Sequence, residues 1–179
     1  MLFQDRRIYT LGLGERELKP FLSLVQQSGI RAVLDIRARP ESAQPAHFAM
    51  EALRQSLDDM GIAYHWAGRH LGAVHAPRPD SVHAALADPL LRGFADHMQS
   101  RECLTAMRQL QNLARSTPCV ILAAELMPER CHRRLIADQL VLAGWTVLHL
   151  LDTTTPREHV LSSEARRESV ELVYDRRRT

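Results

Sequence analysis

Five short runs of apolar residues recur along the chain, separated by segments long enough to form helices. Within each run the apolar residues follow one another almost without alternation, which is typical of strands covered on both faces of a parallel sheet. The predicted strands are residues 8–11, 32–36, 62–66, 119–124 and 147–151.

Three segments between these runs repeat apolar residues at the spacing of an amphipathic helix. A glycine follows each segment at the position where a left-handed C-cap is expected. The segments and their glycines are 18–25 with Gly29, 50–60 with Gly61, and 136–143 with Gly144.

Residues 81–115 are longer than one usual helix. Pro89 and Gly93 predict a break into a short helix and a longer one, because proline interrupts the helical hydrogen bonds and glycine weakens a helix. The longer helix is expected to carry Phe94, Met98, Leu104, Met107 and Leu110.

The alternation of strands and helices predicts an α/β fold, with a mostly parallel five-stranded sheet and helices on both faces. We expect one α/β domain over residues 1–152. Residues 153–179 differ in character, because their six arginines balance six acidic residues when Asp152 is counted. They are expected to form a charged C-terminal arm that is solvated and packs on the body or on a neighbouring molecule.

Composition is that of an ordinary soluble domain: 179 residues, 45% hydrophobic, 25% charged and a formal net charge of +2. So small a charge makes nucleic acid an unexpected, though not excluded, partner. The three cysteines are widely spaced and form no Cys-x-x-Cys motif, so a disulfide framework is not expected. A signal peptide and a long apolar span are both missing from the sequence, which predicts a cytoplasmic protein without a membrane partner. The oligomeric state is left open.

Candidate site residues follow from the rule that ligands bind beyond the carboxyl ends of parallel strands. After the first and third predicted strands this rule selects 12–14 and 68–72. After the second and fourth strands it selects polar residues that are expected to meet at one edge of the sheet: Asp35, Arg37, Arg39, Ser42, Glu125, Cys131, His132 and Arg133.

The fourth crossover places basic residues beside the start of a helix that Pro128 can open. Because a helix N-terminus is already positive, an anion that binds Arg133 would offset the repulsion. The alternative is that Arg130, Arg133 and Arg134 pair with surface acids. Cys131 is either a nucleophile with a lowered pKa or a small core residue.

His132 either transfers protons or donates a hydrogen bond to Glu125 or Asp35. Asp35 interrupts an apolar strand and is expected to form a structural ion pair with Arg37 or Arg133. Arg37 is in turn the expected ligand-binding residue.

Neither a metal nor a cofactor is expected. His65, His70 and His75 recur at intervals of five, but this spacing seldom closes a tetrahedral site. The Gly-Leu-Gly-Glu sequence at 12–15 lacks the third glycine of a dinucleotide fingerprint and the Gly-Lys-Ser/Thr of a phosphate-binding loop.

Several of these segments resemble the domain of unknown function 488 family of small bacterial and archaeal proteins. The resemblance covers about residues 6–151. It is carried by Asp-Ile-Arg-Ala-Arg-Pro-Glu-Ser at 35–42 and by Ala-Ala-Glu, a proline-containing turn and Cys-His-Arg at 123–133, with weaker matches at 8–12 and 70–72. It implies a compact α/β fold with a pocket between these loops, and no established reaction.

The chain departs from the family pattern at two positions. Leu13 stands where the family usually has histidine, and Ala123 stands where it usually has a first cysteine. A mechanism with paired thiols is therefore excluded. The chain is then either a variant with altered specificity or a binding protein that has lost turnover.

The sequence thus predicts a pocket for a small anionic, phosphate-bearing ligand. In the leading hypothesis Arg37 and Arg133 bind the anion, Glu125 and His132 position or transfer protons, and Cys131 is the nucleophile of an enzyme of unknown reaction. The alternative is a non-catalytic module that senses a metabolite or binds a protein or nucleic acid.

Overall fold

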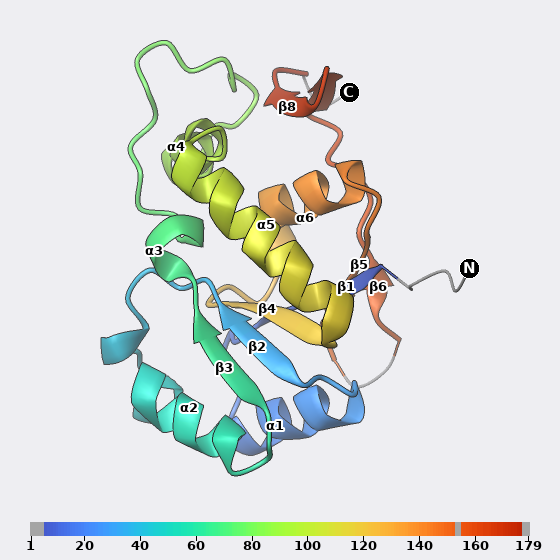
Figure 1. Cartoon of the computed structure of the whole chain (residues 1–179). Helices are drawn as coiled ribbons and strands as arrows, with labels where there is room; N and C mark the ends of the chain where they lie inside the picture. The colour runs from blue at the N-terminus through green and yellow to red at the C-terminus, as the bar shows by residue number, and fades with distance from the viewer. Residues whose placement is uncertain (1–5, 153–154, 177–179) are drawn as a thin grey trace, which may run out of the picture.

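The computed structural model describes residues 6–152 and 155–176, and of Ser42 the backbone without the side chain. A central sheet has the order β3-β2-β4-β1-β5-β6, in which the first five strands are parallel and β6 is antiparallel to β5 (Figure 1). The strands are β1 (Arg7–Gly12), β2 (Ala32–Asp35), β3 (Ala63–Trp66), β4 (Cys119–Ala123), β5 (Thr146–Leu150) and β6 (Arg157–Glu158).

Helices cover both faces of this sheet (Figure 1). One apolar layer joins the sheet to α1 (Leu18–Gln27) and α2 (Met50–Asp58). The other joins it to α3 (Gly68–Leu71), α4 (Pro89–His97), α5 (Arg101–Ser116) and α6 (Arg133–Leu142). Successive strand residues alternate between the layers, as Val33 and Leu34 do, because side chains point to opposite faces of a strand. The predicted α/β class is confirmed.

All five predicted strands are present, but the sheet has six strands instead of five. The sixth, β6, consists of one arginine and one glutamate, so it carries no apolar signal. It joins the sheet because it pairs with β5 at His149 and Leu148.

Three of the expected helices match α1, α2 and α6. Gly29, Gly61 and Gly144 have φ angles of 68°, 67° and 83°, which confirms the left-handed C-caps. The segment 81–115 does contain two helices, but the break lies at residues 98–100 instead of near Pro89 and Gly93. Pro89 opens α4, and the side chain of Ser100 caps α5 by accepting from the Cys103 amide at 3.1 Å.

Described residues beyond β5 lie against the body. After β6 the chain forms a hairpin of β7 (Ala165–Glu168) and β8 (Glu171–Tyr174). Tyr174 is buried and donates a hydrogen bond to Asp138 of α6 at 3.0 Å. In the described part of the chain, no helix is long and apolar enough to cross a membrane.

The connections from β1 and β4 leave the sheet in opposite directions. α1 follows β1 onto one face, and α6 follows β4 onto the other. Because β1 and β4 are neighbours, their carboxyl ends form a topological switch point, which is where open α/β sheets usually bind ligands.

Candidate functional site

A cavity of about 400 Å³ lies at the carboxyl ends of β1, β2 and β4. It brings together four of the polar residues selected from the sequence, which come from the segments after β2 and β4. The lining residues are Leu13, Gly14, Arg37, Ala38, Arg39, Ala43, Gln44, Phe48, Ala73, Leu90, Ala124, Glu125 and His132.

The segments after β1 and β4 pack directly against each other. The amides of Leu13 and Gly14 donate to the carbonyls of Ala123 and Ala124 at 2.9 and 2.8 Å. A Cβ atom on Gly12 would lie 1.9 Å from the carbonyl oxygen of Glu125, so glycine is required at this close approach. This contact holds one wall of the cavity in place.

Asp35 and Arg37 form a buried ion pair behind the opposite wall. Nη2 of Arg37 donates to Oδ2 of Asp35 at 2.6 Å, and Nε donates to the same carboxylate at 3.0 Å. The carboxylate also accepts the Tyr64 hydroxyl at 2.6 Å, and burial together with Asp35 raises the pKa of that hydroxyl. Such a pair satisfies both charges and fixes the direction of the guanidinium.

Arg37 is anchored on a second side as well. Its Nη1 donates to the backbone carbonyl of Phe48 at 2.8 Å. The residue is only 8% exposed, and it is one of the residues that line the cavity. Arg39 also lines the cavity and is exposed, so it is free to adjust to a ligand. The side chain of Ser42, another predicted ligand-binding residue, lies outside the described part of the structure.

Arg133 is not among the residues that line the cavity. Its side chain is fully buried, and its guanidinium donates to the backbone carbonyls of Glu125 and Leu126, the latter at 2.6 Å. It therefore holds the turn that follows β4 and presents Glu125 to the cavity. The sequence left open whether Asp35 pairs with Arg37 or with Arg133. In the structure it pairs with Arg37.

Cys131 is buried in the core layer between the sheet and α6. Burial, with a smaller contribution from Glu125 and against the opposing effect of Arg133, raises the pKa of its thiol to about 12. The thiol is therefore protonated at neutral pH. It accepts the Arg133 amide at 3.5 Å, so in this arrangement Cys131 packs and caps instead of facing the cavity.

His132 is held in one tautomer. Its Nε2 lies 2.8 Å from the carbonyl oxygen of Leu71, which can only accept, so Nε2 carries the proton. Nδ1 carries the lone pair and lies 3.8 Å from the Cys131 sulfur. Burial lowers the pKa of the imidazole, which keeps it neutral. The ring can thus accept a proton at Nδ1, while its orientation is fixed from the other side.

The start of α6 offers few free amides to an anion. Arg134 donates its amide to the Cys131 carbonyl at 3.1 Å, and Leu135 donates to the His132 carbonyl at 2.9 Å. Positive charge toward the cavity therefore comes from the arginines after β2, not from the N-terminus of this helix.

Sequence reasoning did not select several wall residues. Gln44 and Phe48 lie beyond the polar residues that follow β2, and Ala73 and Leu90 come from around the long connection into α4. These four residues are uncharged and do not directly follow a predicted strand, so the strand-end rule does not mark them. Among the described residues, no group of three or more metal-ligating side chains is placed to hold a metal ion.

Comparison with protein-family models finds a match to the family described as Domain of unknown function DUF488, over residues 17–140. This range includes β2 through most of α6 and all of the polar residues at the cavity. No significant match was found among curated proteins or among solved structures. Because the match covers well over half of the chain, the protein belongs to the DUF488 family.

Proposed function

We propose that the cavity at the ends of β1, β2 and β4 binds a small anionic ligand, with Arg37 and Arg39 as the anion-binding residues. The observation that carries the proposal is the ion pair with Asp35, which orients Arg37 before any ligand arrives. A guanidinium that is already oriented loses little freedom on binding, and its fork matches carboxylate and phosphate oxygens.

The volume of the cavity and the charges in its wall narrow the class of ligand. A volume of about 400 Å³ is in the range of small-molecule sites, which is roughly 300–1,000 Å³. Glu125 lines the same cavity and would repel a bare polyanion. The ligand we favour therefore combines a phosphate or carboxylate, held by the arginines, with a hydrogen-bond donor that faces Glu125.

This binding could serve an enzymatic reaction on the ligand. The second candidate function is binding of the ligand without catalysis. It is favoured by the burial and protonation of Cys131, since a nucleophile must reach the ligand as a thiolate. The enzymatic alternative would then depend on proton transfer by Glu125 and His132. Nucleophilic catalysis by Cys131 stays a prediction.

Thermal unfolding with a panel of phosphate, sulfate, adenosine monophosphate and small phosphorylated sugars tests the proposal. A ligand at a hundred times its Kd adds roughly 2.7 kcal/mol to the free energy of unfolding, so the melting temperature should rise by several degrees. In Arg39→Gln the rise should largely disappear, because this exposed arginine contacts the anion without supporting the fold.

Arg130→Gln is the matched control, since Arg130 is also exposed and near α6 but does not line the cavity. It should keep the full rise. Equal responses of the two variants, or no response of the native protein to the whole panel, would rule out anion binding here.

A further inference from the structure

The strand β3 forms an open edge of the central sheet. Among the described residues it pairs with β2 on one side and with no strand on the other. Ala63, His65 and Trp66 are exposed along it, with Trp66 at 43%. An uncovered edge strand offers unpaired backbone groups to another chain.

The direction of these backbone groups follows from the pairing with β2. The amides of Ala63 and Ala67 donate to the carbonyls of Arg31 and Asp35 at 2.9 and 2.8 Å. Because backbone groups alternate along a strand, the N–H and C=O groups of Tyr64 and Trp66 point toward the open edge. They form a ready template for one additional strand.

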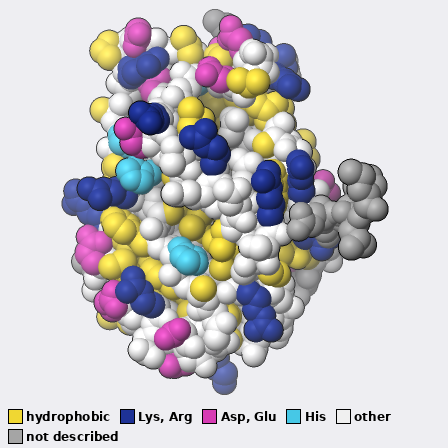
Figure 2. Space-filling model, in the orientation of Figure 1, with side chains coloured by type: hydrophobic (Ala, Val, Ile, Leu, Met, Phe, Trp, Pro, Cys, Tyr) yellow, Lys and Arg dark blue, Asp and Glu magenta, His cyan; other side chains and the backbone are white. Residues whose placement is uncertain are grey.

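A hollow of about 510 Å³ lies beside this edge, between β3 and α5. Its floor is apolar, since Leu34, Ala106 and Leu110 are each at most 8% exposed. On the face seen in Figure 2, hydrophobic and histidine side chains gather over β3 and the adjoining part of α5. Every second side chain of an added strand would face this hollow.

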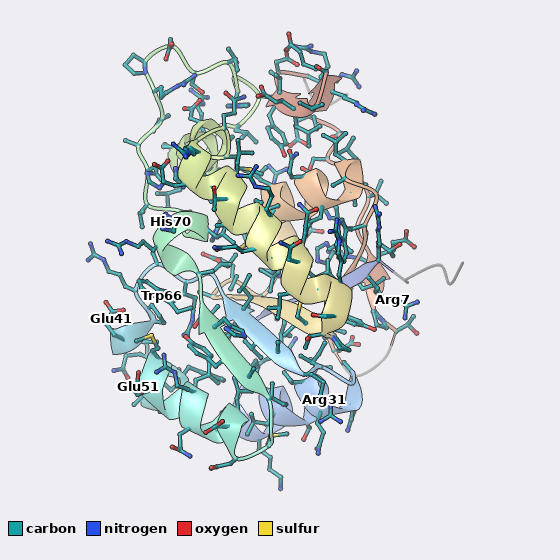
Figure 3. The ribbon with its side chains drawn as sticks, in the orientation of Figure 1. Arg7, Arg31, Glu41, Glu51, Trp66 and His70 are labelled. Atoms are coloured by element: carbon teal, nitrogen blue, oxygen red, sulfur yellow. The ribbon has the colours of Figure 1, made fainter. Side chains whose placement is uncertain are left out.

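The rim of the hollow is basic. His65, Arg69 and His70 line it, and no described side chain of its lining is acidic. Trp66 and His70 lie near the same end of β3, where the strand leads into α3 (Figure 3). On the opposite face of the strand, the guanidinium of Arg54 lies over the Tyr64 ring at 5.4 Å and pairs with Glu51 at 3.2 Å, so the positive charge beside the edge comes chiefly from Arg69.

We infer that β3 and α5 form a docking site for an extended, acidic segment of a partner protein. The segment adds to β3 as a strand, inserts alternate apolar side chains over Leu34 and Leu110, and places a carboxylate beside Arg69. The charge favours this occupant over a second copy of the chain, because edge-to-edge pairing of two copies would bring the same basic side chains together. The site is separate from the anion cavity.

Titration with acetyl-(Glu-Val)₄-amide, read by isothermal calorimetry and by Trp66 fluorescence, tests the inference. We expect this peptide to bind at least tenfold more tightly than acetyl-(Lys-Val)₄-amide. Methylating every second backbone nitrogen, on the side that pairs with β3, should weaken binding at least tenfold, since it removes the donors that strand addition needs.

Arg69→Glu should reverse the preference between the two peptides. Arg108→Glu makes the same charge change on α5 outside the hollow and should leave the preference as it is. The inference is overturned by no binding at millimolar peptide, by binding that N-methylation does not weaken, or by a dimer in sedimentation that Arg69→Glu strengthens. Preference for an oligothymidylate over the acidic peptide would assign the edge to nucleic acid and overturn it equally.

Discussion

The guanidinium of Arg37 uses three of its five N–H groups on Asp35 and Phe48, and the residue also lines the cavity. Arg133, two residues from Cys131, directs its guanidinium to backbone carbonyls instead. The sequence places both arginines near a strand end, but it does not show which way each side chain turns. That choice depends on carbonyls such as those of Phe48 and Leu126, which any residue type supplies.

The reactivity of the Cys131 thiol toward an alkylating reagent provides a test at the residue scale. Because burial raises its thiol pKa to about 12, the thiolate fraction at pH 8 is on the order of one in ten thousand. We expect iodoacetamide to leave Cys131 unmodified for hours in the folded protein at pH 8 and to modify it within minutes in 6 M urea, as followed by peptide mass spectrometry. Selective alkylation of folded protein near pH 7 would instead support the nucleophile.

His149 links protonation to stability. Burial, with His159, Arg133 and Arg157 adding to the effect, lowers its pKa to about 3. Its Nδ1 meets the Thr10 hydroxyl at 2.6 Å, and its Nε2 meets Nδ1 of His159 at 2.9 Å. The folded state therefore keeps His149 neutral where the unfolded state, with a pKa near 6.5, already binds a proton.

The contribution of this neutral histidine to the free energy of unfolding is fully present above about pH 6.5. It is lost as the pH falls toward 3. Between pH 6 and pH 4 the free energy of unfolding should drop about 1.4 kcal/mol per pH unit more steeply in the native protein than in His149→Gln, as measured by urea unfolding. His65→Gln, at an exposed histidine, should keep the native slope. Parallel profiles for the native protein and His149→Gln would contradict this assignment.

At the scale of elements, apolar periodicity predicts the five parallel strands, three helices and their glycine caps, because these features depend on local spacing and on burial against the sheet. The hairpin of β7 and β8 and the short β6 escape such reasoning. The residues of β6 and β7 are mostly charged, β8 has only three consecutive apolar or aromatic residues, and the hairpin is held by distant groups, above all by Asp138 of α6. The charged pattern of this segment does not reveal that contact.

Asp138 collects three hydrogen bonds from the chain beyond β5. It accepts from Nε2 of His159 at 2.8 Å, from the Ser162 amide at 2.8 Å and from the Tyr174 hydroxyl at 3.0 Å. Asp138→Asn places a donor opposite these donors and should lower the free energy of unfolding by about 3 kcal/mol. Amide exchange should accelerate in β7 and β8 more than in β1 and β4.

Tyr174→Phe removes one of these bonds and should cost about 2 kcal/mol, since bonds to a charged group are worth roughly 1.5–3 kcal/mol. Asp175→Asn, at a neighbouring acid whose pair with Arg166 is exposed, is the control and should have a small effect. Equal loss of stability in Asp138→Asn and Asp175→Asn would show that the buried carboxylate does not anchor the segment.

At the scale of the whole molecule, the order of the strands brings the candidate residues together. β4 lies between β1 and β2, so three segments far apart in the sequence end beside one cavity. The strand-end rule selects residues from these segments, and Arg37, Arg39, Glu125 and His132 among them line the cavity. It does not separate them from Asp35, Cys131 and Arg133, which are buried and are not among the lining residues, because burial depends on how the segments fold over one another.

The central claim is that Arg37 and Arg39 bind an anion in this cavity. The most direct measurement is the anomalous difference map of a crystal soaked in tungstate, a tetrahedral anion that scatters strongly. The account predicts a peak within hydrogen-bond distance of Arg39 and between the segments that follow β2 and β4, and predicts its loss in Arg39→Gln. A peak elsewhere on the protein with this cavity empty, or one that persists in Arg39→Gln, would contradict it.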